Sequence, residues 1–409
     1  MIKVLIIGYV WPEPNSSAAG SRMMQLIDLF MAQGWQVSYA SPAATSSFMF
    51  DIESIGIQRI PIELNSSSFD DFISSFQPDI VMYDRFMMEE QFGWRVDTHC
   101  PAALTILETV DLHCLRDARH LALKQQRELV KRDFFSDVAK REVASIHRCD
   151  LTLMISTIEI DILEKYFNVD LVLLHHVPFM LPTISEETVK EWPKFSERQH
   201  FITIGNFKHE PNWDAVQILK KTIWPIIRKS LPDVECHIYG AYASEKVNQL
   251  NNKKDGFLIK GRAENANCVV KQARICLAPL RFGAGIKGKL VEAMINGTPS
   301  ITTDIGAESM CADYPWNGAI ENDPVEFAKK AINIYGNKEL WLQSQKNGIK
   351  IINAVYNKQD VGEKLIARIK MISDNLDTHR LNNFTGAMLK HHSMRSTEFM
   401  SRWIEEKNK

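Results

Sequence analysis

The feature that most constrains the fold of this chain is an alternation of short apolar runs with stretches of helical periodicity. Short apolar runs bounded by turn residues are typical of buried strands, and the segments between them are long enough for helices. This alternation predicts parallel sheets with helices packed on both faces. The expected strands are residues 3–7, 36–39, 58–62, 79–82, 103–107, 151–155 and 171–174 in the first half, and 201–205, 235–239, 257–260, 275–278 and 300–302 in the second.

A polar stretch with several prolines, residues 177–199, divides the chain into two halves that each begin with a strand. At roughly 150 residues per domain, 409 residues are enough for two large domains. We therefore expect an α/β protein of two doubly wound domains facing each other across a cleft. The expected parts are an N-terminal domain at 1–185, a C-terminal domain at 186–358 and C-terminal helices at 359–409.

Charge and cysteine content exclude several classes of protein. The 48 Lys and Arg residues against 50 Asp and Glu leave a net charge of -2, so no basic field favours nucleic acid. The seven cysteines include no Cys-x-x-Cys pair, which argues against a cysteine zinc site and favours a reducing compartment. No apolar run reaches the roughly 18 residues of a spanning helix, and the run before Gly8 is too short for a signal peptide. We expect a cytoplasmic protein.

The segment that most indicates chemistry is a loop at residues 281–288, RFGAGIKG, between an expected strand and an expected helix. Its three glycines let the backbone approach a ligand closely. The following helix offers unpaired N–H groups and a partial positive charge at its N-terminus. Lys287 and Lys289 add full charges, so the loop is predicted to bind a phosphate or a diphosphate. A tight turn with solvated lysines is the alternative.

Two neighbouring features bear on this prediction. Gly283, Gly288 and Lys289 satisfy most of the ATP-binding P-loop pattern, but Leu290 stands where a Ser or Thr would hold magnesium. A second loop, residues 205–212, follows the first strand of the second half and carries Lys208. Asn212 is the expected N-cap of the helix after it. A lone loop lysine is more often solvated than bound to a ligand.

Taken together, these segments resemble a family-4-type (group 1) glycosyltransferase with the GT-B fold of two Rossmann-like domains. The resemblance rests on residues 205–215 (GNFKHEPNWDA), 278–293 (APLRFGAGIKGKLVEA) and 296–299 (NGTP). Residues 14–22, 78–81 and 111–113 are similar, more loosely, to landmarks of the acceptor domain. The resemblance implies that a helix near residues 360–371 crosses back to the N-terminal domain.

The resemblance implies a retaining, metal-independent transfer from a nucleotide-sugar to a glycan, lipid-linked or protein acceptor. The nucleotide-sugar is the donor substrate, and no cofactor is expected; the chain has no Asp-x-Asp pair. Lys208, Lys287 and backbone N–H groups would stabilise the leaving diphosphate. Glu292 would bind the ribose, and His113 would face the donor sugar. The remaining expected donor contacts are Gly20, Arg262, Gly285 and Ile286, with Arg262 near the base or paired with Glu264.

One departure from the family pattern leaves alternatives open. The first Glu of the Glu-x7-Glu motif falls on Ala284, so the usual carboxylate beside the donor sugar is absent. A catalytically silent GT-B subunit that scaffolds a partner transferase is therefore an alternative, and a nucleotide-sugar epimerase is another. A dinucleotide oxidoreductase is disfavoured, because the first strand is followed by Gly8-Tyr-Val-Trp-Pro rather than Gly-x-Gly-x-x-Gly.

Residues 116–148 combine nine Lys and Arg residues with five acids and several apolar side chains. A basic, partly amphipathic helix beside the acceptor site would contact anionic lipid at the inner face of the membrane. The five interspersed acids favour instead a solvated outer helix of the N-terminal domain.

Overall fold

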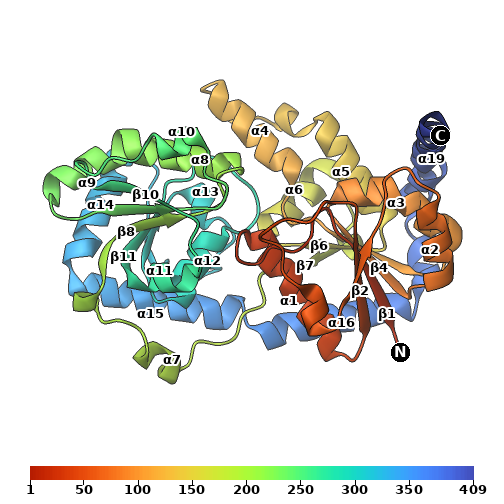
Figure 1. Ribbon diagram of the computed structural model, residues 1–409, viewed down its shortest axis with the longest axis horizontal. Helices are drawn as coiled ribbons and strands as arrows, with labels where there is room; N and C mark the ends of the chain where they lie inside the picture. The colour runs from red at the N-terminus through yellow and green to blue at the C-terminus, as the bar shows by residue number, and fades with distance from the viewer.

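The computed structural model describes residues 1–409 and consists of two α/β domains side by side (Figure 1). The first contains a seven-stranded parallel sheet in the order β3-β2-β1-β4-β5-β6-β7, and the second a six-stranded parallel sheet in the order β10-β9-β8-β11-β12-β13. The predicted fold class is thus confirmed. The strands are β1 (Lys3–Ile7), β2 (Gln36–Ser41), β3 (Gln58–Pro61), β4 (Ile80–Asp84), β5 (Leu104–Glu108), β6 (Leu151–Met154), β7 (Leu174–His176), β8 (Gln199–Ile204), β9 (Cys236–Tyr239), β10 (Phe257–Gly261), β11 (Ala273–Ala278), β12 (Ser300–Thr302) and β13 (Gly318–Ile320).

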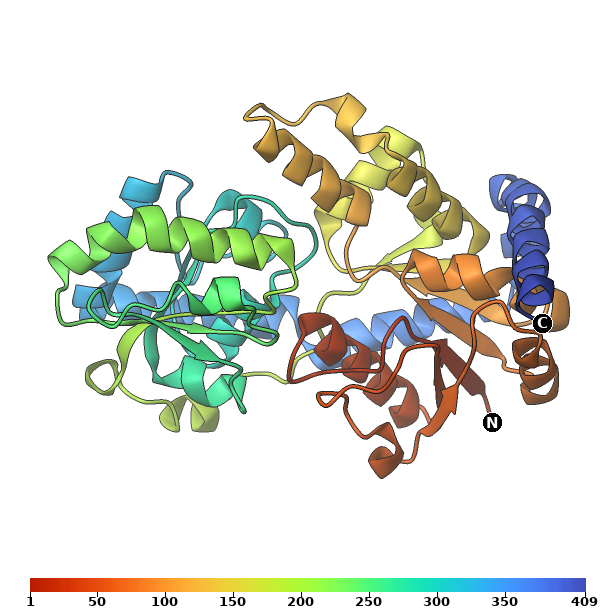
Figure 2. The same ribbon diagram turned by 45° about the horizontal axis from the view of Figure 1, so that its top comes forward.

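Helices cover both faces of each sheet (Figures 1 and 2). None of them contains an 18-residue stretch apolar enough to cross a bilayer. The α-helices are α1 (Ala18–Ala32), α2 (Ser68–Phe76), α3 (Phe86–His99), α4 (His113–Lys124), α5 (Asp137–Arg148), α6 (Thr157–Phe167), α7 (Glu186–Lys190), α8 (Glu210–Ile218), α9 (Trp224–Ser230), α10 (Glu245–Asn248), α11 (Ala266–Gln272), α12 (Gly288–Ile295), α13 (Asp304–Ala307), α14 (Pro324–Gly336), α15 (Lys338–Val355), α16 (Lys358–Ser373), α17 (Leu376–Leu381), α18 (Phe384–Leu389) and α19 (Arg395–Asn408).

The central strand β1 shows why continuous apolar runs predicted buried parallel strands. It pairs with β2 on one side and β4 on the other. Because successive side chains of a strand point to opposite faces, Val4 and Ile6 enter one core cluster while Leu5 and Ile7 enter another. All four are fully buried. A strand that helices cover on both faces is apolar at every position, so its sequence does not alternate between polar and apolar residues.

The strand orders place the functional loops. In each sheet the first strands of the chain are added on one side of the starting strand and the later strands on its other side. The change of side lies between β1 and β4 in the first domain and between β8 and β11 in the second. Ligands of open parallel sheets bind at the carboxyl ends of the strands beside such a switch point. The loops that follow β1, β5, β8 and β11 meet between the two domains, where α4 reaches from the first domain toward the second (Figures 1 and 2).

Several local expectations need correction. Residues 171–173 form a 3-10 turn, so β7 begins only at Leu174, and β13 was not predicted at all. The helix after β8 is capped by His209 rather than Asn212, which lies inside α8. A π-helical turn at residues 219–223 joins α8 to α9.

The basic segment at residues 116–148 is not one helix. It folds as α4 and α5 with a 3-10 turn between them. Most of its cations are held in ion pairs, which leaves few free charges for a lipid surface. The pairs are Arg116–Asp111, Arg119–Glu308, Arg127–Asp133, Lys140–Asp137, Arg141–Glu90 and Arg148–Glu89.

Helix α16 packs on the first domain although it follows the second in sequence. Leu365, Ile366, Ile369 and Ile372 are buried in the same core cluster as the side chains of β1 and β4. Below both sheets, α15 and α16 run from one domain to the other (Figure 1). The C-terminal helices continue along the first domain, where Arg380 binds Asp150.

We expect Ile369→Ala to destabilise the protein by about 2–5 kcal/mol, because it removes a buried side chain from the core that α16 shares with the first sheet. Urea unfolding followed by circular dichroism measures the change. Lys370→Ala on the exposed side of the same helix is the control. Equal stabilities of the two variants would contradict the packing of α16 described above.

Candidate active site

Helix N-termini converge between the domains. Helix α12 begins at Gly288, directly after Lys287, and α1 begins at Ala18. A Cβ atom on Gly288 would lie 2.5 Å from the Cβ of Ala18, so the two helix starts are in close contact and the glycine is required. A helix N-terminus attracts anions through its free N–H groups and its dipole. Two such termini facing each other form a strongly anion-attracting surface.

The loop before α12 is shaped by its glycines. Gly285 has φ +63°, and a Cβ there would lie 3.0 Å from the Cβ of Asp111 in the first domain. Its N–H group donates to Glu159 Oε1 at 3.0 Å. Ala284 packs against the core of the first domain. The loop is therefore docked into the first domain, and only glycine fits at its turning point.

Two lysines place positive charge at this junction. Lys287 is 8% exposed, and its Nζ donates to the carbonyl of Gly285 at 2.6 Å. Burial lowers the pKa of Lys287 to about 8, although the nearby Glu308 opposes the shift. Lys289 Nζ donates to Asn212 Oδ1 at 2.8 Å, and burial lowers its pKa to about 8 as well. Burial raises the pKa of Glu292, one turn further, to about 7, against the effect of Lys289.

Glu159 joins the loop to the first domain. This fully buried carboxylate accepts from the N–H of Leu112 at 2.7 Å and from that of Gly285 at 3.0 Å, both through Oε1. Its Oε2 accepts from Ser156 Oγ at 3.0 Å. Burial raises the pKa of Glu159, and the charge of Asp111 adds to the shift. One side chain thus fixes both the glycine loop and the backbone beside His113.

His113 stands at the first residue of α4. Its Nε2 lies 3.4 Å from Asp111 Oδ1, and its N–H donates to Glu142 Oε1 at 2.7 Å. Burial lowers the pKa of His113 to about 4, although Asp111 opposes the shift. Burial would raise the pKa of Asp111, but Arg116 and His113 outweigh it and lower that pKa to about 2. Near neutral pH the site therefore holds a neutral imidazole beside an ionised carboxylate.

An ion pair also closes the junction from the outer side. Arg119 of α4 donates to both carboxylate oxygens of Glu308, at 2.6 and 2.8 Å, and to the carbonyl of Gly283 at 2.8 Å. Elsewhere along the interface Tyr242 Oη donates to the carboxylate of Glu13. These contacts hold the two domains in a closed arrangement.

The structure brings together some of the predicted residues and leaves others apart. Lys287, Gly285 and the buried Ile286 belong to the junction, and Glu292 lies one turn into α12. The Nζ of exposed Lys208 instead lies 3.8 Å from the centre of the Tyr242 ring.

The structure also shows what two further residues of the prediction contact. Gly20 packs against the backbone of Glu13 in its own loop, and it is Ala18 that α1 presents to the glycine loop. Arg262 stacks on Phe48 of the first domain, 4.5 Å from the ring centre, rather than pairing with Glu264. Its Nε is buried without a hydrogen-bond partner, which leaves a donor for a ligand.

The sequence interpretation missed Glu159, Arg119 and Glu308. For Glu159 a signal was present, because Ser156-x-x-Glu159 before an apolar run is the pattern of a helix start. Arg119 was grouped with the basic segment. Its partner Glu308 lies 189 residues away, so no local pattern connects them.

One group of side chains has the composition of a metal site, but it lies elsewhere. His200, Glu235 and His237 bring their ligand atoms within 4.8 Å of one another. They stand at the beginnings of β8 and β9, the opposite end of the sheet from the glycine loop. A metal ion bound there would not reach the junction.

Arg119→Ala is expected to open the two domains, because it removes the bidentate ion pair and the bond to Gly283. A hydrogen bond to a charged group contributes about 1.5–3 kcal/mol, so the ratio of open to closed forms would rise roughly 10- to 150-fold. Small-angle X-ray scattering would record a larger radius of gyration. Arg141→Ala, which breaks an ion pair within the first domain, is the matched control. An unchanged radius in Arg119→Ala would show that this ion pair does not hold the closed form.

Comparison with known proteins identifies the second domain. Residues 198–337 match the family model described as glycosyl transferases group 1. A curated relative, an uncharacterized 44.6 kDa protein in the cps region of Klebsiella pneumoniae, is 25% identical over 201 residues, which are 45% of this chain and 50% of that protein. The chain thus spans about half the length of this relative.

Similar solved structures cover both domains. Sucrose-phosphate synthase from Thermosynechococcus elongatus has a TM-score of 0.67 at 13% identity, over 91% of this chain and 99% of that one. A mutant of TarM from S. aureus, in complex with fondaparinux, alpha-GlcNAc-glycerol and UDP, has a TM-score of 0.69 at 11% identity, over 90% and 99%. HepE from Anabaena in complex with UDP-glucose has a TM-score of 0.68 at 10% identity, over 91% and 100%. Residues 198–337 thus form a domain of the group 1 glycosyltransferase type, set within a two-domain GT-B fold.

Proposed function

We propose that this protein is a glycosyltransferase of the family-4 type that moves a sugar from a nucleotide-sugar to an acceptor held by the first domain. One observation carries the proposal: the N-terminus of α12 faces the N-terminus of α1 across the junction, and buried Lys287 lies at the start of α12. A leaving nucleoside diphosphate is the anion that this arrangement suits. The acceptor would be a glycan, a lipid-linked glycan or a protein.

Stabilising the leaving group is the main electrostatic task of such a reaction. Negative charge builds up on the diphosphate as the bond to the sugar breaks. Lys287 and Lys289 together with the N–H groups of the two helix starts would meet that charge without rearranging, because they are already fixed by packing. Two lysines and the N–H groups of two helix starts would supply the positive charge that the leaving diphosphate requires, so we propose that the transfer needs no metal ion.

The rest of the donor would extend over the second domain. Glu292 lies one turn beyond the diphosphate loop and would accept hydrogen bonds from the ribose hydroxyls. Arg262, with its unpartnered Nε, would contact the base. Neutral His113 would hydrogen-bond a hydroxyl of the donor sugar without adding charge. We further propose retention of configuration, from the resemblance of the loop motifs, which NMR of the product anomer would test.

A catalytically silent subunit is the second candidate, and Ala284 motivates it. In the structure Ala284 packs against the first domain, so that position contributes packing instead of a carboxylate. The two candidates differ in what Glu292→Ala does. Loss of about 10²-fold or more in transfer is expected of the enzyme, whereas a scaffold would keep its biological activity.

Nucleoside diphosphates are expected to stabilise the protein in the presence of EDTA. At 100 times its Kd a ligand adds about 2.7 kcal/mol to the folded state. Thermal unfolding with UDP, GDP, ADP, ATP and their sugar conjugates, each with EDTA and with magnesium, would identify the base. Stabilisation only by ATP with magnesium would contradict the proposal and favour a P-loop enzyme.

Lys287→Ala is expected to weaken nucleoside diphosphate binding roughly 10- to 150-fold, because it removes a charged hydrogen bond of about 1.5–3 kcal/mol. Isothermal titration calorimetry measures the effect. Lys221→Ala, at an exposed lysine on the π-helical turn after α8, is the control for a loss of charge alone. Unchanged affinity in Lys287→Ala would remove Lys287 from the diphosphate site.

Nucleoside diphosphate affinity is expected to fall as the pH rises through about 8. The free protein loses the ammonium charges of Lys287 and Lys289 near that pH, whereas phosphate groups complete their ionisation near pH 6. Binding favours the charged lysines, so it is linked to proton uptake above pH 8. Above pH 8, deprotonation of each lysine that must be charged would lower the affinity by up to about tenfold per pH unit. A flat profile between pH 7 and 9.5 would be the contrary result, and Lys287→Ala is expected to show a shallower slope.

A further inference from the structure

Two histidines and a glutamate form a compact group at the end of the second sheet that lies away from the glycine loop. His200 belongs to β8, His237 belongs to β9, and Glu235 directly precedes β9. The parallel pairing of β8 with β9 brings these two strand starts side by side. The ligand atoms of the three side chains all lie within 4.8 Å of one another.

The distances within the group suit a shared metal ion. His237 Nε2 lies 2.7 Å from Glu235 Oε2, and His200 Nε2 lies 4.0 Å from the same oxygen, which is too far for a hydrogen bond. Two ligand atoms of a tetrahedral zinc ion are roughly 3.3 Å apart, since each lies about 2.0–2.1 Å from the metal. The two observed distances fall on either side of that value, so small side-chain rotations would bring all three ligands onto one ion.

The charge states of the group agree with this geometry. Burial lowers the pKa of His200 and that of His237, so both imidazoles are neutral near neutral pH. The hydrogen bond from His237 lowers the pKa of Glu235, which is therefore ionised. Neutral imidazole and carboxylate are the forms that ligate metals. Binding through both Nε2 atoms would require a change of tautomer but no net loss of a proton.

Two features of the group oppose a bound cation. His200 Nδ1 accepts a long hydrogen bond, at 3.3 Å, from the N–H of Glu235. It would give up this bond if Nε2 bound the ion, because the ring proton would then move to Nδ1. Lys260 of β10 brings a positive charge near all three side chains, but it is exposed, so solvent screens that charge. Both costs are small beside the free energy of metal coordination.

The kinds of ligand select the class of metal. Imidazole nitrogen suits zinc and its transition-metal neighbours, whereas magnesium and calcium take oxygen ligands. Three protein ligands leave the fourth position of a tetrahedral ion to water. The three side chains are 19–38% exposed, so an ion could enter from solution and a chelator could remove it.

We propose that His200, Glu235 and His237 bind a divalent transition metal ion, for which zinc is the best match, and that the ion fastens the start of β8 to β9. His200 has φ +62°, which is uncommon for a residue other than glycine, and coordination would offset this backbone strain. An ion that binds only the folded arrangement stabilises it. The site does not depend on the proposed function, because it lies at the other end of the sheet from Lys287.

The test uses the full-length protein, treated with EDTA and then freed of it, and zinc alone as the ligand. We expect calorimetry to show one zinc ion bound per chain at micromolar concentration, with a rise in Tm that EDTA reverses and that magnesium does not produce. His237→Ala and the isosteric Glu235→Gln are expected to weaken zinc binding at least about tenfold. Circular dichroism checks the folding of each variant, and Glu235→Gln decides the question if His237→Ala does not fold.

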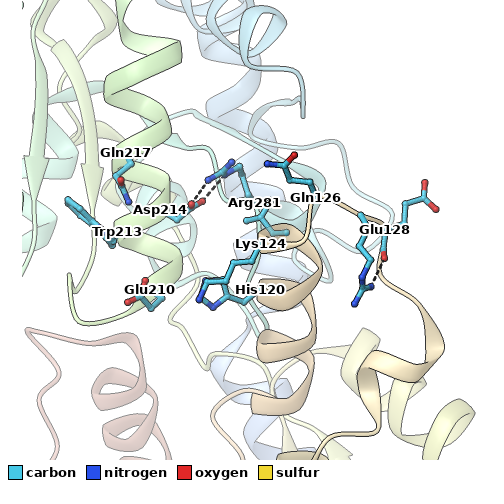
Figure 3. A pocket seen from close by; sticks show the side chains of 11 residues that line it. His120, Lys124, Gln126, Glu128, Glu210, Trp213, Asp214, Gln217 and Arg281 are labelled. Atoms are coloured by element: carbon cyan, nitrogen blue, oxygen red, sulfur yellow. Dashed lines mark hydrogen bonds and ion pairs between the residues drawn. The ribbon is translucent and has the colours of Figure 1, made fainter.

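His120→Ala is the matched control, because it removes an imidazole that also stands near carboxylates. His120 lines a cleft between α4 and α8 beside the glycine loop, and Asp214 lines the opposite wall (Figure 3). His391→Ala/His392→Ala removes a neighbouring pair of exposed histidines. Both controls are expected to bind zinc as the unaltered protein does.

Zinc binding that both site variants weaken and both controls retain supports the proposal. Lys260→Ala is expected to tighten zinc binding by up to about fivefold, since it removes a like charge beside the ion. Failure of the unaltered protein to bind zinc overturns the proposal, as does unchanged affinity in His237→Ala and Glu235→Gln. Zinc binding that is lost only in a control variant also overturns it, because the ion would then lie elsewhere.

Discussion

The buried carboxylate of Glu159 is the contact on which the junction between the domains depends. One of its oxygens accepts two hydrogen bonds: one from the N–H of Leu112, beside His113, and one from the N–H of Gly285 in the loop of the other domain. Burying a carboxylate is costly unless its lone pairs are filled. Because the N–H of Gly285 reaches Glu159 only when the domains are closed, the closed form is the one in which this carboxylate has all three of its donors. The positions of Lys287 and His113 relative to each other follow from that requirement.

Charge is distributed so that the junction stays receptive to an anion. Arg119 is neutralised by Glu308 and Arg116 by Asp111, while burial weakens the ionisation of Lys287 and Lys289. An anion that entered would restore full charge to both lysines and gain two helix N-termini. Cationic groups that packing has already fixed need no reorganisation when negative charge develops. The same rigidity explains why glycine is required at 285 and 288, where any side chain would push the domains apart.

Much of the fold could be predicted from the sequence, because helices on both faces make parallel strands uniformly apolar. Prediction failed where the local signal is weak. Strand β13 is only three residues long, and the basic segment has a helix-forming composition on both sides of the 3-10 turn that separates α4 from α5. In the candidate site, the local motif already places Lys287 and Gly285 in one loop, because they are only two residues apart in the chain. For Lys208 the motif does not give the direction of the side chain, and in the structure its Nζ lies 3.8 Å from the centre of the Tyr242 ring.

The sequence by itself determined two parallel sheets, the order of their elements and a glycine-lysine loop at a helix start, since each of these depends on residues adjacent in the chain. Only the tertiary structure decided which side chains face that loop. Glu159 and Arg119 meet it across 126 and 164 residues, and the cleft beside it has one wall from each domain. Hydrogen bonds and ion pairs over such separations leave no periodic trace in a sequence, because they arise from how two finished domains pack.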